Sequence, residues 1–364
     1  MAGTRLFTLN PTFIMEPYDF GKGCIDYQYF RQCVGIDVAK NEFHARMCMF
    51  QIGLDYGDFS EDKIFSNSKT GFNQLVRWAR KEFVKGQEFR FIMEATGSYH
   101  ELLACHLHAC GFTVFVVPPL KAHHFAQYYG FSVKTDRVDA YVLSILGCVE
   151  RRIKPWLPPS PLLARLRSLT RTRYELADEK VSLSNRIEAV THMKDPARES
   201  VKALEQSRDY IDGRIKMLEG KIEQTLKSDA DLWRKCRHLQ TIPGVGLNTC
   251  ATVIAETNGF EFVISSKQLV SFAGLDVKIH DSGMLKGKSR ISKKGNKFIR
   301  RALYMPALSA SSCNPQQKQL YERLIERRGN AKGVKIYALT AVMRKLLVVM
   351  FSLWKNDADY DSSM

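Results

Sequence analysis

Between residues 33 and 149 the sequence alternates between short apolar runs typical of strands and longer stretches whose apolar residues recur at helical spacing. Helical spacing covers residues 71–84, and Thr96-Gly97 marks the start of a second helix. The strand-like runs are residues 33–38, 44–50, 64–65, 89–93 and 113–117. This alternation predicts an α/β domain in which helices pack on a sheet. In such domains the chemistry lies at the carboxyl ends of the strands.

Four acidic residues stand at the ends of these apolar elements. Asp37 lies at the end of the first strand-like run, and Glu94 follows a later one. Asp136 and Asp139 precede the apolar run 141–146, so on a helix both carboxylates project from one face of its first turn. Carboxylates gathered in this way repel one another unless a cation lies between them, and oxygen ligands suit a hard cation. The four acids therefore predict a Mg²⁺ site.

Each acid taken alone also has an ordinary explanation: a turn cap for Asp37, a pairing with Arg90 for Glu94, a helix N-cap for Asp136. The prediction rests on the set. Acids on a first strand, on a later strand and doubled at a helix start have the layout of a ribonuclease H-like nuclease fold, in which two Mg²⁺ ions assist phosphodiester cleavage. The sugar kinase and actin superfamily is a rival fold with a similar first strand. That fold requires glycine-rich phosphate loops later in the chain, whereas the second half here is helical and basic.

The charge balance indicates a polyanionic partner. Lys and Arg number 54 against 38 acids, a net charge of +16, which favours DNA or RNA over a neutral small substrate. The nine cysteines include no C-x-x-C pair, so we expect reduced thiols and a cytoplasmic location. No uncharged apolar run approaches the ~20 residues of a membrane span. The run from Leu339 to Trp354 is broken by Arg344 and Lys345, and no membrane association is expected.

Prolines between Pro155 and Pro161 mark a domain boundary. Beyond it, apolar residues follow mostly a seven-residue repeat over residues 162–190 and again over residues 201–222, with Asp195-Pro196 between the two stretches. This pattern predicts a long helical hairpin or coiled coil. A dimerisation or spacer element and simple packing within one subunit are both open at this point.

Two features near the carboxyl end predict contact with nucleic acid. Leu239 to Gly246, followed by residues 249–254, has the form of a helix-hairpin-helix turn, in which Gly244 and Gly246 let backbone N–H groups reach a phosphate. A tight connection between two helices is the alternative explanation. Residues 282–301 carry eight basic side chains and no acid, which favours a phosphate-contacting surface over a merely solvated one. These side chains are Lys286, Lys288, Arg290, Lys293, Lys294, Lys297, Arg300 and Arg301.

These motifs together resemble the IS110 family of insertion-sequence transposases. Val34-Gly-Ile-Asp37, Met93-Glu94-Ala-Thr-Gly97 and residues 134–140 look like the family's Asp-Glu-Asp-Asp domain. Four further motifs look like its C-terminal transposase domain, namely residues 242–246, 272–275, 281–283 and 291–296. The resemblance covers about residues 33–350.

The resemblance implies a fold and a mechanism. The N-terminal domain is expected to be RuvC-like, with a ribonuclease H fold, and to hold Mg²⁺ through Asp37, Glu94, Asp136 and Asp139. Ser282 is the serine that would attack DNA and form a phosphoserine link, with Ser289 and Ser292 as the alternative nucleophiles of the same stretch. The resemblance further implies a structured guide RNA, a homodimer or homotetramer, and a bacterial or archaeal host in whose nucleoid the enzyme acts.

We therefore predict an N-terminal extension, a RuvC-like domain, a coiled-coil segment, a mainly helical transposase domain and a short tail. Their bounds are 1–31, 32–154, 155–230, 231–354 and 355–364. Three other functions are open: a Piv-like site-specific DNA invertase, a metal-dependent nuclease or Holliday-junction resolvase that uses the acids alone, and a DNA-binding protein without catalysis.

Overall fold

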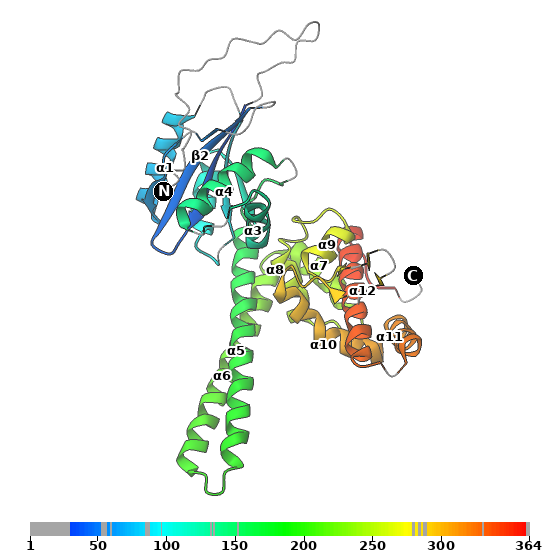
Figure 1. Cartoon of the computed structure of the whole chain (residues 1–364). Coiled ribbons are helices and arrows are strands. Elements are labelled where there is room, and N and C mark those ends of the chain that lie inside the picture. Colours follow the sequence, from blue (N-terminus) through cyan, green and yellow to red (C-terminus); the bar gives the residue numbers. More distant parts are fainter. Residues whose placement is uncertain are drawn as a thin grey trace. The chain divides into compact units, whose positions relative to one another are not determined.

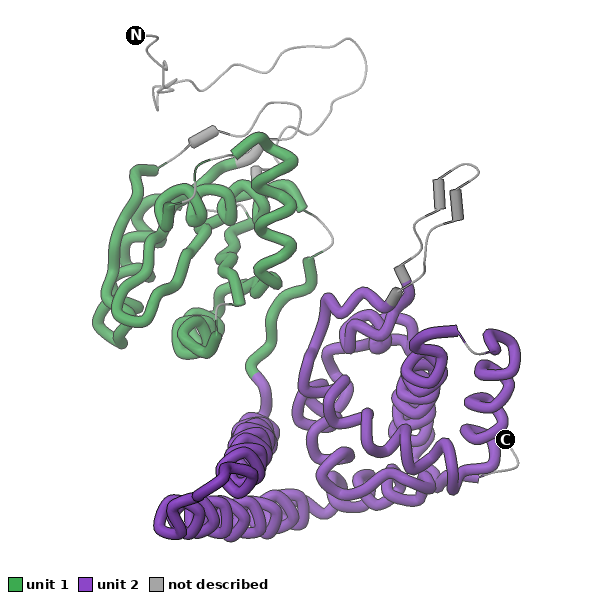
Figure 2. The backbone as a smooth tube through the Cα atoms, turned by 60° about the horizontal axis from the view of Figure 1, so that its bottom comes forward, with its two compact units in different colours: residues 1–158 green, residues 159–364 purple. Residues whose placement is uncertain are grey.

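The computed structural model describes residues 30–51, 57–58, 60–83, 88–95, 97–131, 133, 135–150, 153–278, 281–282, 285–286, 290–329 and 331–361. The predicted N-terminal extension lies outside these residues, apart from its last two positions, which belong to the first strand. The chain divides into two compact units, Met1–Pro158 and Pro159–Met364 (Figure 2). The predicted division into five segments stays a prediction.

Unit 1 contains a six-stranded mixed sheet with the strand order β3-β2-β1-β5-β6, and β4 also pairs with β2. β1 pairs with β2 in the antiparallel sense, whereas β1, β5 and β6 run parallel. The strands are β1 (Phe30–Val38), β2 (Glu42–Gln51), β3 (Gly57–Asp58), β4 (Lys63–Ser66), β5 (Glu88–Glu94) and β6 (Thr113–Val117). The predicted strands and their alternation with helices are confirmed; the ribonuclease H fold itself stays a prediction.

Four helices belong to unit 1: α1 (Lys69–Glu82), α2 (Glu101–Ala109), α3 (Pro119–Tyr128) and α4 (Asp136–Val149). The helix expected after the paired aspartates is α4. Its N-cap is Thr135 rather than Asp136, because Thr135 has an extended backbone and its hydroxyl accepts a hydrogen bond from the N–H of Val138. Asp136 and Asp139 therefore both lie in the first turn of the helix, as the spacing predicts.

The two faces of the sheet pack on different helices because successive side chains of a strand point to opposite faces. On one face, Val34 and Ile36 join a core with residues of α1 and α2. On the other face, Cys33 of β1 and Ile92 of β5 pack with residues of α3 and α4. The odd-numbered positions of β1 and the even-numbered positions of β5 thus share the α4 face.

Unit 2 consists of helices and two short strand pairs. The hairpin of α5 (Pro161–Thr191) and α6 (Arg198–Lys227) confirms the predicted pair of long helices (Figure 1). Its distal part packs around Leu183, Ile211 and Ile215. The other helices are α7 (Ala230–Gln240), α8 (Leu247–Glu256), α9 (Ser266–Phe272), α10 (Lys297–Cys313), α11 (Pro315–Arg328) and α12 (Val334–Asn356). The strands are β7 (Val277–Lys278), β8 (Asp281–Ser282), β9 (Leu285–Lys286) and β10 (Arg290–Ile291).

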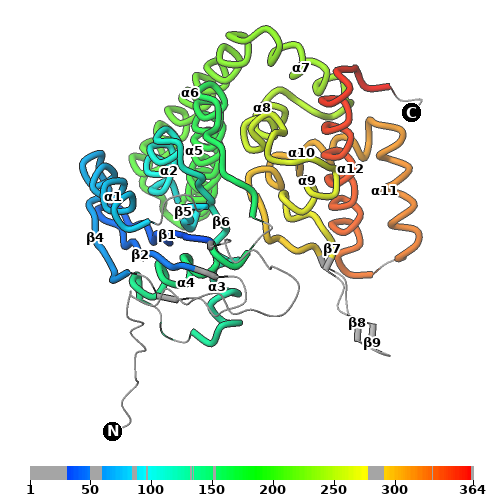
Figure 3. The backbone as a smooth tube through the Cα atoms, turned by 90° about the horizontal axis from the view of Figure 1, so that it is seen from above, coloured from blue at the N-terminus to red at the C-terminus, as the bar shows by residue number. Residues whose placement is uncertain are grey.

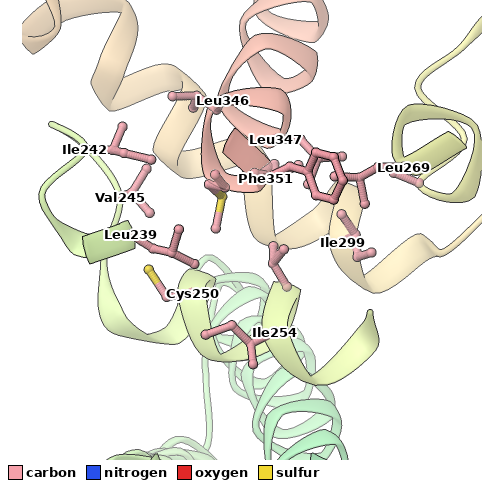
Figure 4. Packing of buried hydrophobic residues seen from close by; sticks show 14 of the residues in the cluster. Leu239, Ile242, Val245, Cys250, Ile254, Leu269, Ile299, Leu346, Leu347 and Phe351 are labelled. Atoms are coloured by element: carbon pink, nitrogen blue, oxygen red, sulfur yellow. The ribbon is translucent and has the colours of Figure 1, made fainter. Parts of the chain in front are cut away.

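The core of unit 2 forms where α7, α8, α9, α10 and α12 meet (Figure 4). Figure 3 shows α10, α11 and α12 side by side in this unit. Among the described helices, only α12 is long and apolar enough to pass a length-and-composition test for a membrane span. Half of its most apolar window is buried inside the protein, including Leu346 and Leu347, so α12 has the character of a core helix.

Candidate active site

Two parallel strands bring Asp37 and Glu94 to the same edge of the sheet. β1 and β5 pair with Ile36 opposite Met93, so the next residues along the two strands, Asp37 and Glu94, are neighbours. Both fall on the α4 face, because Asp37 lies two residues beyond Gly35, and Glu94 lies two residues beyond the buried Ile92. The two carboxylates thus stand at adjacent carboxyl ends of parallel strands.

A close approach at Gly35 brings the third and fourth acids to this edge. A Cβ atom on Gly35 would lie 2.1 Å from the carbonyl oxygen of Ala140 and 2.2 Å from the backbone nitrogen of Ser144. The backbone of α4 therefore rests directly on β1 at a point where only glycine leaves room. Since Ala140 directly follows Asp139, this contact holds the first turn of α4 next to the end of β1.

The charge of the three neighbouring acids is visible at Asp37. The pKa of Asp37 is raised to about 6, mainly by burial and then by the negative charges of Asp136, Asp139 and Glu94, in that order. His44, which faces Asp37 across the β1–β2 pair, lowers the pKa of Asp37. The structure thus brings together all four acids that the sequence singled out.

The donor chemistry of this cluster fits a hard cation. Four carboxylates converge on one edge, and their mutual repulsion is the kind that a divalent ion relieves. Within the described part of the chain, however, no three His, Cys, Asp or Glu side chains lie at ligand spacing. The four acids therefore converge loosely, and binding would have to draw the carboxylates inward.

Ser282 lies in unit 2, in the segment between α9 and α10. It is the last residue of β8 and pairs with Leu285 of β9 in a two-stranded antiparallel sheet. Its side chain lies outside the described residues, as do all atoms of Ser289. The hydroxyl of Ser292 donates to a carboxylate oxygen of Asp276, and its N–H donates to the Asp276 carbonyl at 2.8 Å. These bonds give Ser292 a structural function at the base of the segment.

Comparison with protein families identifies both halves of the chain. Residues 34–193 match the family model of the Asp-Glu-Asp-Asp transposases of IS110, and residues 236–322 match the model described as the IS116/IS110/IS902 transposase family. The chain belongs to the IS110 family of transposases. It is accordingly a DNA transposase or recombinase, and DNA is its partner.

Two curated relatives show what this chain is similar to. The pilin gene-inverting protein of Moraxella bovis is 28% identical over 90% of this chain and 97% of its own length. The transposase for insertion sequence element IS1111A of Coxiella burnetii is 36% identical over 39% of this chain and 38% of its own length. A solved Ppx/GppA family protein of Aquifex aeolicus aligns with 91% of this chain and 92% of its own at 9% identity and a TM-score of 0.21, which is too low to carry an argument.

Two of the basic side chains predicted to contact nucleic acid instead bond to other residues of this IS110-family protein. Arg300 donates to the carbonyls of Ala273 and Gly295 at 2.8 and 2.9 Å, and burial lowers its pKa. Arg301 pairs with Asp178 of α5 and covers the ring of Tyr174.

The other six basic positions are described to different extents. Lys297 is exposed at the start of α10, with its ammonium over the ring of Phe298. Lys293 and Lys294 are exposed as well. The side chains of Lys286, Lys288 and Arg290 lie outside the described residues.

The turn between α7 and α8 has a packing explanation at one of its two glycines. Gly244 has a φ of 92°, and a Cβ there would lie 2.9 Å from the backbone nitrogen of Ala310 in α10. Gly246 is the N-cap of α8, and nothing lies within 4 Å of the position its Cβ would take. The N-terminus of α8 is therefore the part of this turn that a phosphate oxygen could approach.

Sequence reasoning missed a buried polar network beside the basic segment. Glu256 is fully buried and bonds to Arg171 of α5 and to Asn296, the N-cap of α10. The signal was available, since Glu256 is the one acid that ends the otherwise uncharged stretch of residues 247–256.

Proposed function

We propose that this IS110-family enzyme cuts and rejoins DNA through Ser282, with Mg²⁺ held by the four carboxylates of unit 1. The observation that carries the proposal is geometric: the pairing of β1 with β5 puts Asp37 beside Glu94, and the close approach at Gly35 holds the turn with Asp136 and Asp139 next to them. Neighbouring carboxylates repel one another when they are ionised, and a bound divalent cation relieves this repulsion. The RuvC-like fold of unit 1 is part of the same proposal.

The proposed serine mechanism leaves the number of phosphodiester bonds unchanged. The hydroxyl oxygen of Ser282 attacks a backbone phosphorus and loses its proton, and the bond to the leaving sugar oxygen breaks as that oxygen gains a proton. The sugar hydroxyl of a second strand end then attacks the phosphoserine and releases the serine. One phosphodiester bond is broken and one is formed, so no ATP is required. Bound Mg²⁺ would act as a Lewis acid that stabilises negative charge on the attacking and leaving oxygens.

The remaining features would hold the nucleic acids. The exposed Lys293, Lys294 and Lys297 beside the serine segment would contact phosphates, and the N-terminus of α8 would do so in the manner of a helix-hairpin-helix turn. A structured guide RNA and a homodimer or homotetramer follow from the family resemblance. Strand exchange supports the oligomer, because it needs more than one reacting serine.

A denaturing gel tests this proposal. The full-length protein is incubated with Mg²⁺, DNA carrying the element's ends and the RNA transcribed beside the gene, for the wild type, Ser282→Ala and Asp136→Ala. We expect a protein–DNA adduct in the wild type and none in either variant. Matched controls are Ser271→Ala on the exposed side of α9 and Asp209→Ala on α6, which should keep the adduct. Nicked DNA without an adduct in Ser282→Ala would instead support the nuclease.

A second candidate function is site-specific inversion. The relative that supports it is the Moraxella bovis protein, named for inverting a pilin gene and matched over 90% of this chain. A plasmid with two candidate sites in inverted orientation separates the two: an invertase flips the segment between them, whereas a transposase moves its own element to a new target.

A further inference from the structure

The turn that follows β5 presents two large apolar side chains to solvent. Tyr99 is 47% exposed and Leu102, one helical turn later, is 72% exposed. The residues that alternate with them are anchored: His100 is 7% exposed, and Leu103 is completely buried in the core of unit 1. The exposed pair therefore stands on a firmly seated start of α2, and apolar area in this arrangement favours a binding surface.

A single side chain ties this turn to the edge that carries the acids. The amide nitrogen of Asn67 donates to the carbonyl of Ala39 at 2.9 Å and to the carbonyl of Tyr99 at 3.3 Å. Ala39 lies two residues beyond Asp37, and Tyr99 lies five residues beyond Glu94. Because both carbonyls bond to one nitrogen, the backbone of Tyr99 is held close to the end of β1.

Asn67 is itself fixed where it stands. It follows β4 and precedes Ser68, the N-cap of α1, and its own N–H donates to the carbonyl of Asn41 at 2.8 Å. Tyr99 is thus an exposed aromatic residue held at the carboxyl edge of the sheet, on the side of α1 and α2, whereas the carboxylates of Asp37 and Glu94 stand at the same edge on the α4 side.

The negative charge at this edge of the sheet determines which kind of ligand group can lie beside Tyr99. The carboxylates disfavour an anion at their own position unless a cation is bound, but an uncharged aromatic base has no such conflict. Tyrosine rings stack on nucleobases, and this contact is independent of sequence because every base has a π-face.

We propose that Tyr99, supported by Leu102, is a stacking platform for a base of the DNA strand held at the acid cluster. This inference rests on the proposed function, since it places DNA at that cluster. Stacking would fix the strand's register next to Asp37 and Glu94 without reading its sequence.

Fluorescence of 2-aminopurine tests the platform apart from the chemistry. Single-stranded DNA of the element's end carries the probe at each position in turn, and the full-length protein is added in Ca²⁺, with a gel to show that the DNA is intact. We expect quenching at one or two adjacent positions with the wild type and with Tyr99→Phe. Tyr99→Ala should lose the quenching and bind about 10-fold more weakly.

Two further variants separate stacking from general effects. Tyr99→Leu keeps apolar area but lacks a ring, so we expect no quenching. Tyr210→Ala removes an exposed tyrosine of the α5–α6 hairpin and should behave as the wild type. The proposal would be wrong if Tyr99→Ala quenched the 2-aminopurine as strongly as the wild type does. It would also be wrong if the protein quenched the probe in RNA but not in DNA. Neither result bears on the phosphoserine adduct, whose loss or retention in Ser282→Ala is read on a separate gel.

Discussion

Arg171 donates two hydrogen bonds to the carboxylate of Glu256, from its Nε at 2.7 Å and its Nη2 at 2.8 Å. Asn296 donates to the same carboxylate at 2.6 Å, while its own side-chain oxygen caps α10 by accepting from the N–H groups of Phe298 and Ile299. The guanidinium of Arg171 also lies 4.6 Å from the centre of the Phe298 ring. One buried acid thus joins α5, α8 and the residue where the basic segment enters α10.

We predict that Arg171→Ala lowers the free energy of unfolding by about 3 kcal/mol, because it leaves Glu256 buried without its guanidinium. Urea unfolding followed by circular dichroism measures the change. Arg208→Ala is the control, since its pair with Asp209 lies on the surface of α6 and should matter by less than about 1 kcal/mol. Adding Glu256→Gln to Arg171→Ala should restore part of the loss. Equal effects of Arg171→Ala and Arg208→Ala would contradict the buried network.

Substitution of Gly35 should weaken metal binding specifically. In Gly35→Ala the new Cβ meets backbone atoms of α4 at 2.1 and 2.2 Å, so the helix must move away from β1 and take Asp136 and Asp139 with it. We expect about 10-fold weaker Mn²⁺ or Mg²⁺ binding by calorimetry, together with a loss of stability of roughly 1–3 kcal/mol from overpacking.

Gly147→Ala is the matched control for that experiment. Its Cβ would meet the sulfur of Cys33 at 2.1 Å, near the other end of α4. The stability should fall in the same way, but the metal affinity should change less than in Gly35→Ala. Equal losses of affinity in the two variants would show that the Gly35 contact does not position the acids.

The acids could be predicted from sequence, whereas the contacts that position them could not. Asp37 and Glu94 end apolar runs, and strand periodicity together with the rule for carboxyl ends of parallel strands is enough to group them. The close approach at Gly35 depends on which helix crosses which strand, and the sequence contains no local signal for that. Asn67 escaped notice for the same reason, because its two acceptors are far away in the chain.

The basic segment shows a different limit. A run of charge does not reveal which of its side chains have partners inside the fold, so the sequence alone does not distinguish Arg300 and Arg301 from the exposed lysines of the same run. The α5–α6 hairpin was predictable because its apolar spacing and the Asp195-Pro196 break are local features. Its membership in the same compact unit as the transposase domain depends on contacts made by α5 with α8, which are not local.

The hairpin should lose an ion-pair contribution in acid. Hydrogen bonds from Lys180 and Lys216 lower the pKa of Asp212 to about 2. Because the folded pKa lies below the unfolded value near 4, this stabilisation is present above pH 4 and disappears as the pH falls toward 2. The difference in unfolding free energy between the wild type and Asp212→Asn should therefore be largest near pH 6 and shrink by pH 3. A difference that stays constant over this range would rule out the lowered pKa.

Lys297 and Arg301 should separate DNA contact from folding. Lys297 is exposed, so Lys297→Gln should weaken binding to any DNA sequence and reduce the slope of log K against log salt concentration by about 0.9, the value for one lost phosphate contact. Its melting temperature should be unchanged. Arg301 is held by Asp178 and the Tyr174 carbonyl, so Arg301→Gln should lower the melting temperature and leave the salt slope as in the wild type. Fluorescence anisotropy at several salt concentrations measures the slopes, and the opposite pattern would place the phosphate contact at Arg301 instead.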